Sequence, residues 1–351
     1  MERFVKEAEL RKALEALASA CQDLEVTAQD IRLDCFSGPE VVLHAGGGFQ
    51  DEVAGPRLVG QLCKRLDPHL SPQLWRRLPG ALQQQLAEEL LRQAPEEVWL
   101  LRLKNGRLRA ILSDADHPFD HQPVVDHMVD ALFSHEDTAF ELYLSELYDD
   151  AAEVRVLFDI RDFEFETADP KIPRRWCGRV ELRNNEVGEG SVRIALYLAP
   201  EGGTAGLRFA ERAVLPHRVT KDIHRRFAEA VALIPRELQG MVVHLREFAA
   251  MRVRYPAAAI SALRRRFTDI PDYAAAAIQA AFEALPGDTG AHLIWALLEA
   301  PKHLPPGRSM PYEVQFRLHE IAAWLCGRAG REWLDRLPAP AVQQLGFATV
   351  A

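Results

Sequence analysis

The clearest structural signal in the sequence is an alternating run on both sides of an Asn-Gly pair, Leu100-Leu101-Arg102-Leu103-Lys104-Asn105-Gly106-Arg107-Leu108-Arg109-Ala110-Ile111-Leu112. Asn-Gly between two alternating runs is the strongest short-range sign of a β-hairpin with a two-residue turn. The run therefore predicts two antiparallel strands joined at Asn105 and Gly106.

The two faces of this hairpin would differ in chemistry. Side chains alternate along a strand, so Lys104 would lie opposite Arg107 and Arg102 opposite Arg109, with all four cations on one face. Like charges at opposite positions destabilise a strand pair, and a phosphate backbone would relieve that repulsion. The same pattern also fits a solvated face, or one that pairs with carboxylates from elsewhere in the chain.

Flanking segments place the hairpin in an α+β fold. Apolar residues at helical spacing predict helices over residues 3–20, 56–93 and 122–133. A second β region spans residues 154–166, and its alternation changes phase at Asp162, where a β-bulge or a short turn is expected.

A return strand is expected over residues 192–198, followed by a helix that starts near Thr220. From residue 240 onward the chain is rich in alanine and divided by prolines, which predicts a helical C-terminal region. We therefore expect antiparallel β-hairpins packed with helices. Three regions follow: a helical or mixed region over 1–95, a β-rich domain with basic hairpins over 96–240, and a helical region over 241–351.

Bulk composition restricts the function. The 351 residues carry a formal net charge of −9, so a nucleic-acid site would have to be a local basic patch. The five cysteines include no C-x-x-C pair, which argues against a disulfide framework or a zinc ribbon. The sequence shows no apolar signal core and no run of 18 apolar residues, so we expect a cytoplasmic protein without membrane association.

Charge is distributed unevenly along the chain. Residues 136–169 hold twelve Asp or Glu against two Arg, and residues 171–226 hold twelve Lys or Arg against six acidic residues. Such asymmetry suggests a basic groove with acidic flanks. The alternative is that the two segments pair with each other in the fold.

Four segments follow one another along the chain in an order and spacing typical of a known family. They are Leu58-Val59-Gly60-Gln61-Leu62-Cys63-Lys64-Arg65-Leu66, Arg109-Ala110-Ile111-Leu112-Ser113-Asp114 with Pro118-Phe119-Asp120, Arg183-Asn184-Asn185-Glu186-Val187-Gly188, and Thr289-Gly290-Ala291-His292-Leu293-Ile294-Trp295-Ala296. Together they resemble the phage/plasmid-like protein family of mobile elements. That family has no assigned activity, so the resemblance implies a mobile-element context and no particular reaction.

This sequence departs from the family pattern in two places. Ala115 and Asp116 stand where the family has Arg-Tyr, and residues 198–203 replace its Cys-x-Asn-Gly. Any role that depends on those residues is not carried over.

The order strand, strand, strand, helix with a basic hairpin is also similar to the build of single-strand annealing proteins of the RecT/Redβ/ERF type. This likeness concerns topology and charge only, and fold does not imply function. It favours a homo-oligomer that binds single-stranded DNA during recombination or replication, without a cofactor.

Candidate phosphate contacts come from both basic hairpins and the helix that follows them. They are Arg102, Lys104, Arg107, Arg109, Arg174, Arg175, Arg179, Arg183, Arg193, Lys221, Arg225 and Arg226. Aromatic side chains near them that could stack on bases are Phe163, Phe165, Trp176 and Tyr197.

Two alternatives from other functional classes stay open. Asp and His residues cluster at Asp114, Asp116, His117, Asp120, His121, Asp126 and His127, which would suit a metal-dependent nuclease or hydrolase. A solvated loop that leads into a helix explains the same cluster and favours a protein without a bound metal. The sequence has no serine-hydrolase, zincin or thiol-enzyme motif, so those classes lack support. On balance the sequence favours a protein that is not an enzyme. The other alternative is a non-catalytic interaction module that docks through the C-terminal helices.

Overall fold

The computed structural model describes residues 2–4, 6–36, 41–113, 120–133, 140–148, 153–166, 172, 175–187, 191–200, 206–209, 213–216 and 223–338. It is an α+β protein with one large and two small antiparallel sheets, and residues 225–335 are mostly helical. The expected fold class is confirmed.

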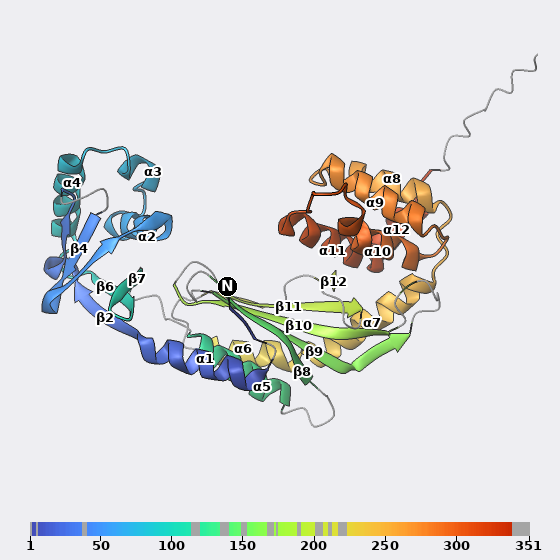
Figure 1. Ribbon diagram of the computed structural model, residues 1–351, viewed down its shortest axis with the longest axis horizontal. Helices are drawn as coiled ribbons and strands as arrows, with labels where there is room; N and C mark the ends of the chain where they lie inside the picture. The colour runs from blue at the N-terminus through green and yellow to red at the C-terminus, as the bar shows by residue number, and fades with distance from the viewer. Residues whose placement is uncertain are drawn as a thin grey trace, which may run out of the picture.

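The large sheet lies at the centre of the molecule (Figure 1). Its strands run in the order β1-β8-β9-β10-β11-β12, with β13 also paired to β11. Their bounds are β1 Glu2–Phe4, β8 Phe140–Tyr148, β9 Glu153–Glu166, β10 Arg175–Asn185, β11 Ser191–Pro200, β12 Leu207–Arg208 and β13 Ala213–Pro216.

One face of this sheet is apolar and covered by helices. The helices are α1 (Glu7–Ala20), α5 (His121–Phe133), α6 (Ile223–Ala232) and α7 (Ile234–Ala250), of which α1, α5 and α6 run along the lower side of the sheet in Figure 1. Every second residue along the central strands belongs to the shared core: Val154, Val156, Phe158, Ile160, Val180, Leu182, Val192, Ile194, Leu196 and Leu198. The face opposite this core is left for polar side chains.

Helix α7 shows how the sequence produces this packing. Pro235 lies in its first turn, where a missing backbone N–H costs no hydrogen bond. Its buried residues recur every three or four positions, at Ile234, Leu238, Met241, Val242, Leu245 and Phe248. The helix therefore places one apolar stripe against the sheet.

An N-terminal lobe holds both small sheets. One has the order β2-β6-β7 and the other β3-β4-β5, and a separate apolar core joins them to the lobe's helices. The bounds are β2 Cys21–Thr27, β3 Arg32–Asp34, β4 Val41–Ala45, β5 Phe49–Val53, α2 Gly55–Leu66, α3 Pro72–Trp75, α4 Gly80–Gln93, β6 Val98–Lys104 and β7 Arg107–Ser113.

A C-terminal helical lobe stands at the other end of the large sheet, on the same side as the N-terminal lobe (Figure 1). Its helices are α8 Pro256–Arg266, α9 Asp272–Ala284, α10 Gly290–Glu299, η3 Ala300–His303, α11 Tyr312–Cys326 and α12 Arg328–Asp335. Among the residues that the structure describes, none of the helices combines the length and apolar character that a membrane span requires.

Several expected elements are confirmed. The predicted helices correspond to α1, to α2 with α3 and α4, and to α5, and the return strand is β11. The register of β9 against β10 shifts between Ile160 and Phe165, so the irregularity expected at Asp162 is present. The division into three regions stays a prediction; residue 240 lies inside α7, and β6 pairs with β2 of the preceding region.

The Asn-Gly hairpin forms, but its faces differ from the prediction. Leu103 pairs with Leu108 and Lys104 with Arg107, but Arg102 pairs with Ala110, because the register shifts by one residue beyond Leu103. Arg109 is therefore the extra residue of a β-bulge, and the expected pairing of Arg102 with Arg109 is wrong.

The Asn-Gly turn provides a direct test of the local backbone. Gly106 has φ 75°, a conformation that costs a residue with a side chain about 1–2 kcal/mol. Gly106→Ala should therefore lower the free energy of unfolding by about 1 kcal/mol in denaturant titrations. Gly60→Ala is the matched control, because Gly60 lies inside α2 with open space around it and should gain about 0.5–1 kcal/mol. Equal effects of the two changes would contradict this account.

Candidate functional site

The polar face of the large sheet carries a row of charged side chains across five strands. Cα partners in neighbouring strands run from Arg3 through Glu146, Arg155 and Arg183 to Arg193. Three arginines thus occupy adjacent cross-strand positions on β9, β10 and β11. Since like charges at opposite positions repel, this row needs anions close to it.

Glu181 supplies the central anion. Only 1% of Glu181 is exposed, and its carboxylate accepts hydrogen bonds from Arg155, Arg183 and the hydroxyl of Tyr197. Burial alone would raise the pKa of this carboxyl, but Arg155 and Arg183 hold the pKa below its ordinary value. The carboxylate is therefore charged and fully engaged by the sheet.

Glu146 supplies a second buried carboxylate, which accepts hydrogen bonds from arginines of the same row. Glu146 is 2% exposed and accepts from Arg3 at 2.9 Å and from Arg155 at 3.3 Å. Burial acts to raise the pKa of Glu146, but hydrogen bonds from Tyr148 and Arg155 lower it overall.

Two further ion pairs flank this centre. Arg179 binds Asp159 through two hydrogen bonds of 2.5 and 3.0 Å, and its guanidinium stacks on Tyr143 at 3.7 Å from the ring centroid. Arg208 of β12 binds Glu320 of α11 at 3.1 Å and stacks on Phe316 at 3.6 Å. The second pair attaches the C-terminal lobe to the polar face.

Two adjoining cavities lie where α11 meets the sheet. One, of about 400 Å³, is lined by Tyr148, Glu153, Arg155, Arg183 and Tyr312. The other, of about 360 Å³, shares Tyr148, Arg155 and Tyr312 and extends past Tyr143 and Tyr197 to His319. We call the two together the arginine–tyrosine cleft.

Tyr312 is the residue that both cavities use from the C-terminal lobe. Its hydroxyl accepts a 2.7 Å hydrogen bond from Nη2 of Arg183, and its ring lies under the guanidinium groups of Arg155 and Arg183 at 5.9 and 5.8 Å. Tyr312 is 49% exposed, so it forms an open wall of the cleft.

A separate polar network joins the N-terminal lobe to the turn after β10. Arg109 donates to the Glu186 carboxylate at 3.1 Å, and the backbone N–H of His121 donates to it at 2.6 Å. Arg102 binds Asp23 through two bonds of 2.9 Å and contacts Asp120 at 2.8 Å. Burial raises the pKa of both Glu186 and Asp120, and the arginines act in the opposite direction.

Gln61 completes this junction. Its side-chain amide donates to the carbonyl of Val187 at 2.5 Å and accepts from the N–H of Ile111 at 3.0 Å. Three of the four segments that carry the family resemblance therefore meet at one place, although they are far apart in the sequence. The fourth segment begins α10, where a Cβ on Gly290 would lie 2.1 Å from the carbonyl oxygen of Phe248.

The predicted phosphate contacts do not form one surface. Arg102, Arg109 and Arg179 are buried and engaged by carboxylates, so the expectation that they are open to a ligand is wrong. Arg179 pairs with Asp159 of β9, as expected if the acidic and basic segments pair with each other. Arg102 and Arg109 pair with carboxylates from elsewhere in the chain, at Asp23, Asp120 and Glu186. Arg107 contacts Asp51 at 3.1 Å beside Lys104, within the N-terminal lobe.

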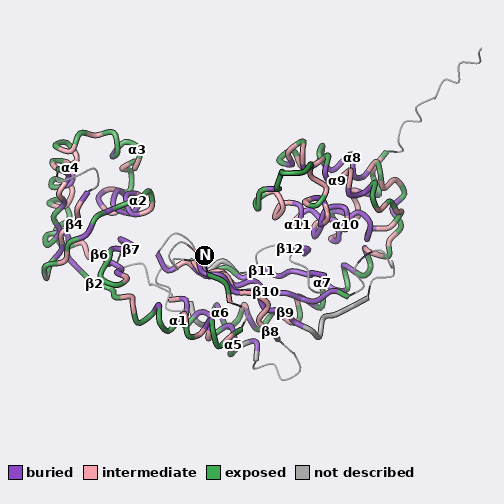
Figure 2. The backbone as a smooth tube through the Cα atoms, viewed as in Figure 1, coloured by how far each residue is buried: buried purple, intermediate pink, exposed green. Residues whose placement is uncertain are grey.

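The remaining predicted cations divide between two sides of the sheet. Arg183 and Arg193 lie on the polar face, and Arg175 is exposed at the start of β10. Arg225 and Arg226 are exposed on α6, which runs along the lower side of the sheet (Figure 2). Phe227 of the same helix belongs to the main core. Arg174 and Lys221 fall outside the described residues.

The aromatic candidates also divide. Trp176 is buried in the main core, whereas Tyr197 lines the cleft. The side chains of Phe163 and Phe165 fall outside the described part of the chain. Sequence reasoning missed Arg3, Arg155, Tyr148, Tyr312 and His319, and only Arg155, which alternates with core residues of β9, left a local signal.

The acidic cluster shows no metal centre in its described part. Asp114, Asp116 and His117 fall outside the described residues, and within those described no group of three metal-ligating side chains occurs. His121 is fully buried and contacts Asn184 and Glu186, and Asp126 pairs with Arg11 at 2.5 Å.

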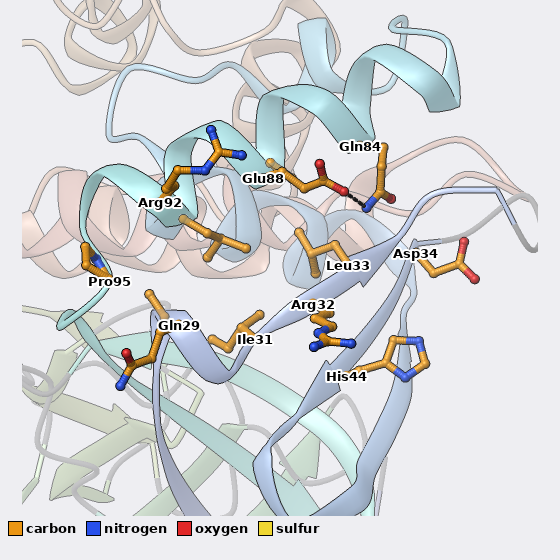
Figure 3. A pocket seen from close by; sticks show the side chains of 13 residues that line it. Gln29, Ile31, Arg32, Leu33, Asp34, His44, Gln84, Glu88, Arg92 and Pro95 are labelled. Atoms are coloured by element: carbon orange, nitrogen blue, oxygen red, sulfur yellow. Dashed lines mark hydrogen bonds between the residues drawn. The ribbon is translucent and has the colours of Figure 1, made fainter.

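A cavity of about 830 Å³ lies in the N-terminal lobe between α4 and β3 (Figure 3). Apolar side chains such as Ile31, Leu33 and Leu91 line it, and its polar groups carry both signs of charge. Gln84 donates to Glu88 at 2.8 Å across one wall. This balance of charge gives the groove no preference for an anion.

Comparisons with protein-family models, curated proteins and solved structures found no match for this chain. The resemblance to the phage/plasmid-like family therefore remains a prediction.

Glu181 offers a test of the polar face. A carboxyl whose pKa is lowered by folding stabilises the protein above its unfolded pKa, and that stability is lost as the pH falls through the folded pKa. Glu181→Gln should lower the free energy of unfolding at neutral pH by about 3 kcal/mol and weaken the loss of stability below about pH 4.5. Glu229→Gln, which removes an exposed partner of Arg225, should change it by less than about 0.5 kcal/mol. A decrease no larger than that of the control would contradict the role of Glu181.

The junction can be tested at Gln61. Gln61→Leu leaves the N–H of Ile111 and the carbonyl of Val187 without this partner, so the free energy of unfolding should fall by about 2 kcal/mol or more. Hydrogen exchange should accelerate at the β6–β7 hairpin. Gln85→Leu on the exposed side of α4 is the control and should leave exchange unchanged. Unaltered protection of Ile111 in Gln61→Leu would disprove this role.

Proposed function

We propose that the polar face of the large sheet binds a single-stranded nucleic acid, with the phosphates held by the row Arg155, Arg183 and Arg193. The observation that carries the proposal is that the first two arginines keep donors available. Nη2 of Arg155 and Nη1 of Arg183 donate no hydrogen bond to a group within the described residues, and the two side chains are 18% and 28% exposed. Both side chains line the cavity of about 400 Å³.

The carboxylates beneath the row support this use. Glu181 and Glu146 bind the inner N–H groups of the arginines and hold the guanidinium planes in place. Arginine has five N–H donors in a fixed fork, so the outer edge can still bind a phosphate in two places. The carboxylates therefore orient the arginines without using all of their donors.

Aromatic side chains at the same place favour a single strand over a duplex. Tyr148 and Tyr312 line the cavity beside the arginines. Bases of an unpaired strand can stack on such rings, whereas a duplex hides the faces of its bases. Phosphate contacts with neighbouring stacking surfaces are typical of proteins that bind single strands without sequence preference.

The net charge of −9 limits where such a strand can lie. Acidic surface elsewhere repels phosphates, so binding would be confined to the polar face. The proposal retains a mobile-element context, a homo-oligomer and a role in recombination or replication from the sequence resemblances. It requires neither an enzymatic step nor a cofactor.

Binding can be measured by fluorescence anisotropy with a labelled single-stranded oligonucleotide across a salt series. The double variant Arg183→Ala with Arg193→Ala should bind more weakly, because fewer phosphates are neutralised in the complex. The slope of log K against log salt should fall by about 0.7 for each phosphate that the variant no longer neutralises.

The double variant Arg225→Ala with Arg226→Ala is the matched control. It removes the same charge from the opposite side of the sheet and should leave binding unchanged. No binding by the unmodified protein at low salt, or equal weakening in both double variants, would refute the proposal.

A further inference from the structure

The arginine–tyrosine cleft consists of an outer cavity, of about 400 Å³, and an inner cavity, of about 360 Å³. The inner cavity differs in chemistry from the arginine row beside it. Its walls include three tyrosines from the sheet, Tyr143, Tyr148 and Tyr197, and Tyr312 and His319 from α11. Its volume of about 360 Å³ lies in the range of sites that enclose small organic ligands. It shares Tyr148, Arg155 and Tyr312 with the outer cavity.

Tyrosine hydroxyls and charged groups of the inner cavity already have partners. Tyr148 donates to Glu146, Tyr197 donates to Glu181, and Arg179 binds Asp159. A ligand group that enters here meets aromatic surface and neutralised ion pairs. An uncharged planar group suits these surroundings better than a second phosphate.

His319 is the exception, because its Nε2 is buried and makes no hydrogen bond within the described residues. Burial and the neighbouring Arg208 lower the pKa of His319 to about 4, so the imidazole is neutral at physiological pH. A neutral imidazole can donate or accept through its ring nitrogens, which matches the mixed donors and acceptors on the edge of a nucleobase.

We infer that the inner cavity holds the base of one nucleotide, with its phosphate on Arg155 and Arg183 and its edge near His319. This inference deepens the proposed function and rests on it where the ligand is a nucleic-acid strand. The group that the site would recognise is a nucleoside phosphate, which can belong to a strand or to a free nucleotide. The carboxylate of Glu153 also lines the outer cavity and would repel a phosphate that lay beyond Arg155 and Arg183.

The test compares a labelled single strand with an abasic strand of the same length, using the full-length protein. The normal strand should bind about 5- to 100-fold more tightly, the range expected for a base stacked on an aromatic side chain. A fluorescent base analogue within the normal strand should change its emission on binding.

Two variants locate the effect. Tyr312→Leu removes a half-exposed stacking ring, and His319→Ala removes the imidazole whose Nε2 makes no hydrogen bond. Both should weaken binding of the normal strand severalfold and weaken binding of the abasic strand much less. His69→Ala, which alters an exposed histidine of the N-terminal lobe, is the control and should change neither.

Competition with a nucleoside monophosphate distinguishes a nucleotide within a strand from a free nucleotide. If the free nucleotide displaces the bound base analogue, the site accepts a nucleotide of either kind. If the normal strand is preferred and no displacement occurs, the site accepts only a strand. Equal affinity for normal and abasic strands overturns the inference and leaves phosphate binding intact.

If no strand binds but the free nucleotide protects Tyr312 and His319 from chemical modification, the proposed function fails and the nucleotide site is supported. If neither binds, both fail.

Discussion

Glu181 lies in the middle of the polar face of the large sheet, with almost none of its carboxylate exposed to water. A carboxylate can be buried to this degree only when cations and hydroxyl donors replace its hydration. Arg155, Arg183 and Tyr197 do so, and they belong to three different strands, β9, β10 and β11. The register of β9, β10 and β11 is therefore tied to one charge, since a slip of one residue would move Glu181 into the apolar core.

This constraint also explains how the C-terminal lobe is placed. A sheet with one apolar and one polar face normally leaves the polar face to water. Here Arg208 and Arg183 extend the charged array to Glu320 and Tyr312 of α11, so polar contacts hold helices over part of that face. Polar attachment of this kind leaves cavities between the partners, because ion pairs and stacked rings do not fill space as closely as aliphatic side chains do.

The fold was predictable from sequence where signals are local. The Asn-Gly pair, the helical apolar stripes and the phase change at Asp162 each depend on neighbouring residues, and all three are present. The faces of the hairpin were not predictable, because one bulged residue, Arg109, moves a cation to a different environment. The site was missed for a related reason. Tyr312 lies 129 residues from Arg183, and no local pattern links a tyrosine at a helix start to an arginine in a distant strand.

The uneven charge along the sequence predicted a basic groove, but most of these charges pair with each other. The physical reason for this pairing also explains how the arginine row arises. Opposite runs of charge that follow one another in antiparallel strands come into register, so most of their charges neutralise each other. Neutralisation is incomplete where cations outnumber anions in one cross-strand row. At Arg3, Arg155 and Arg183, three cations share the two buried carboxylates of Glu146 and Glu181. The excess is small, but it is fixed in orientation and lies beside aromatic rings, and such preorganised donors bind an anion at little cost in side-chain entropy. A protein with a net negative charge can in this way carry an anion site that its composition conceals.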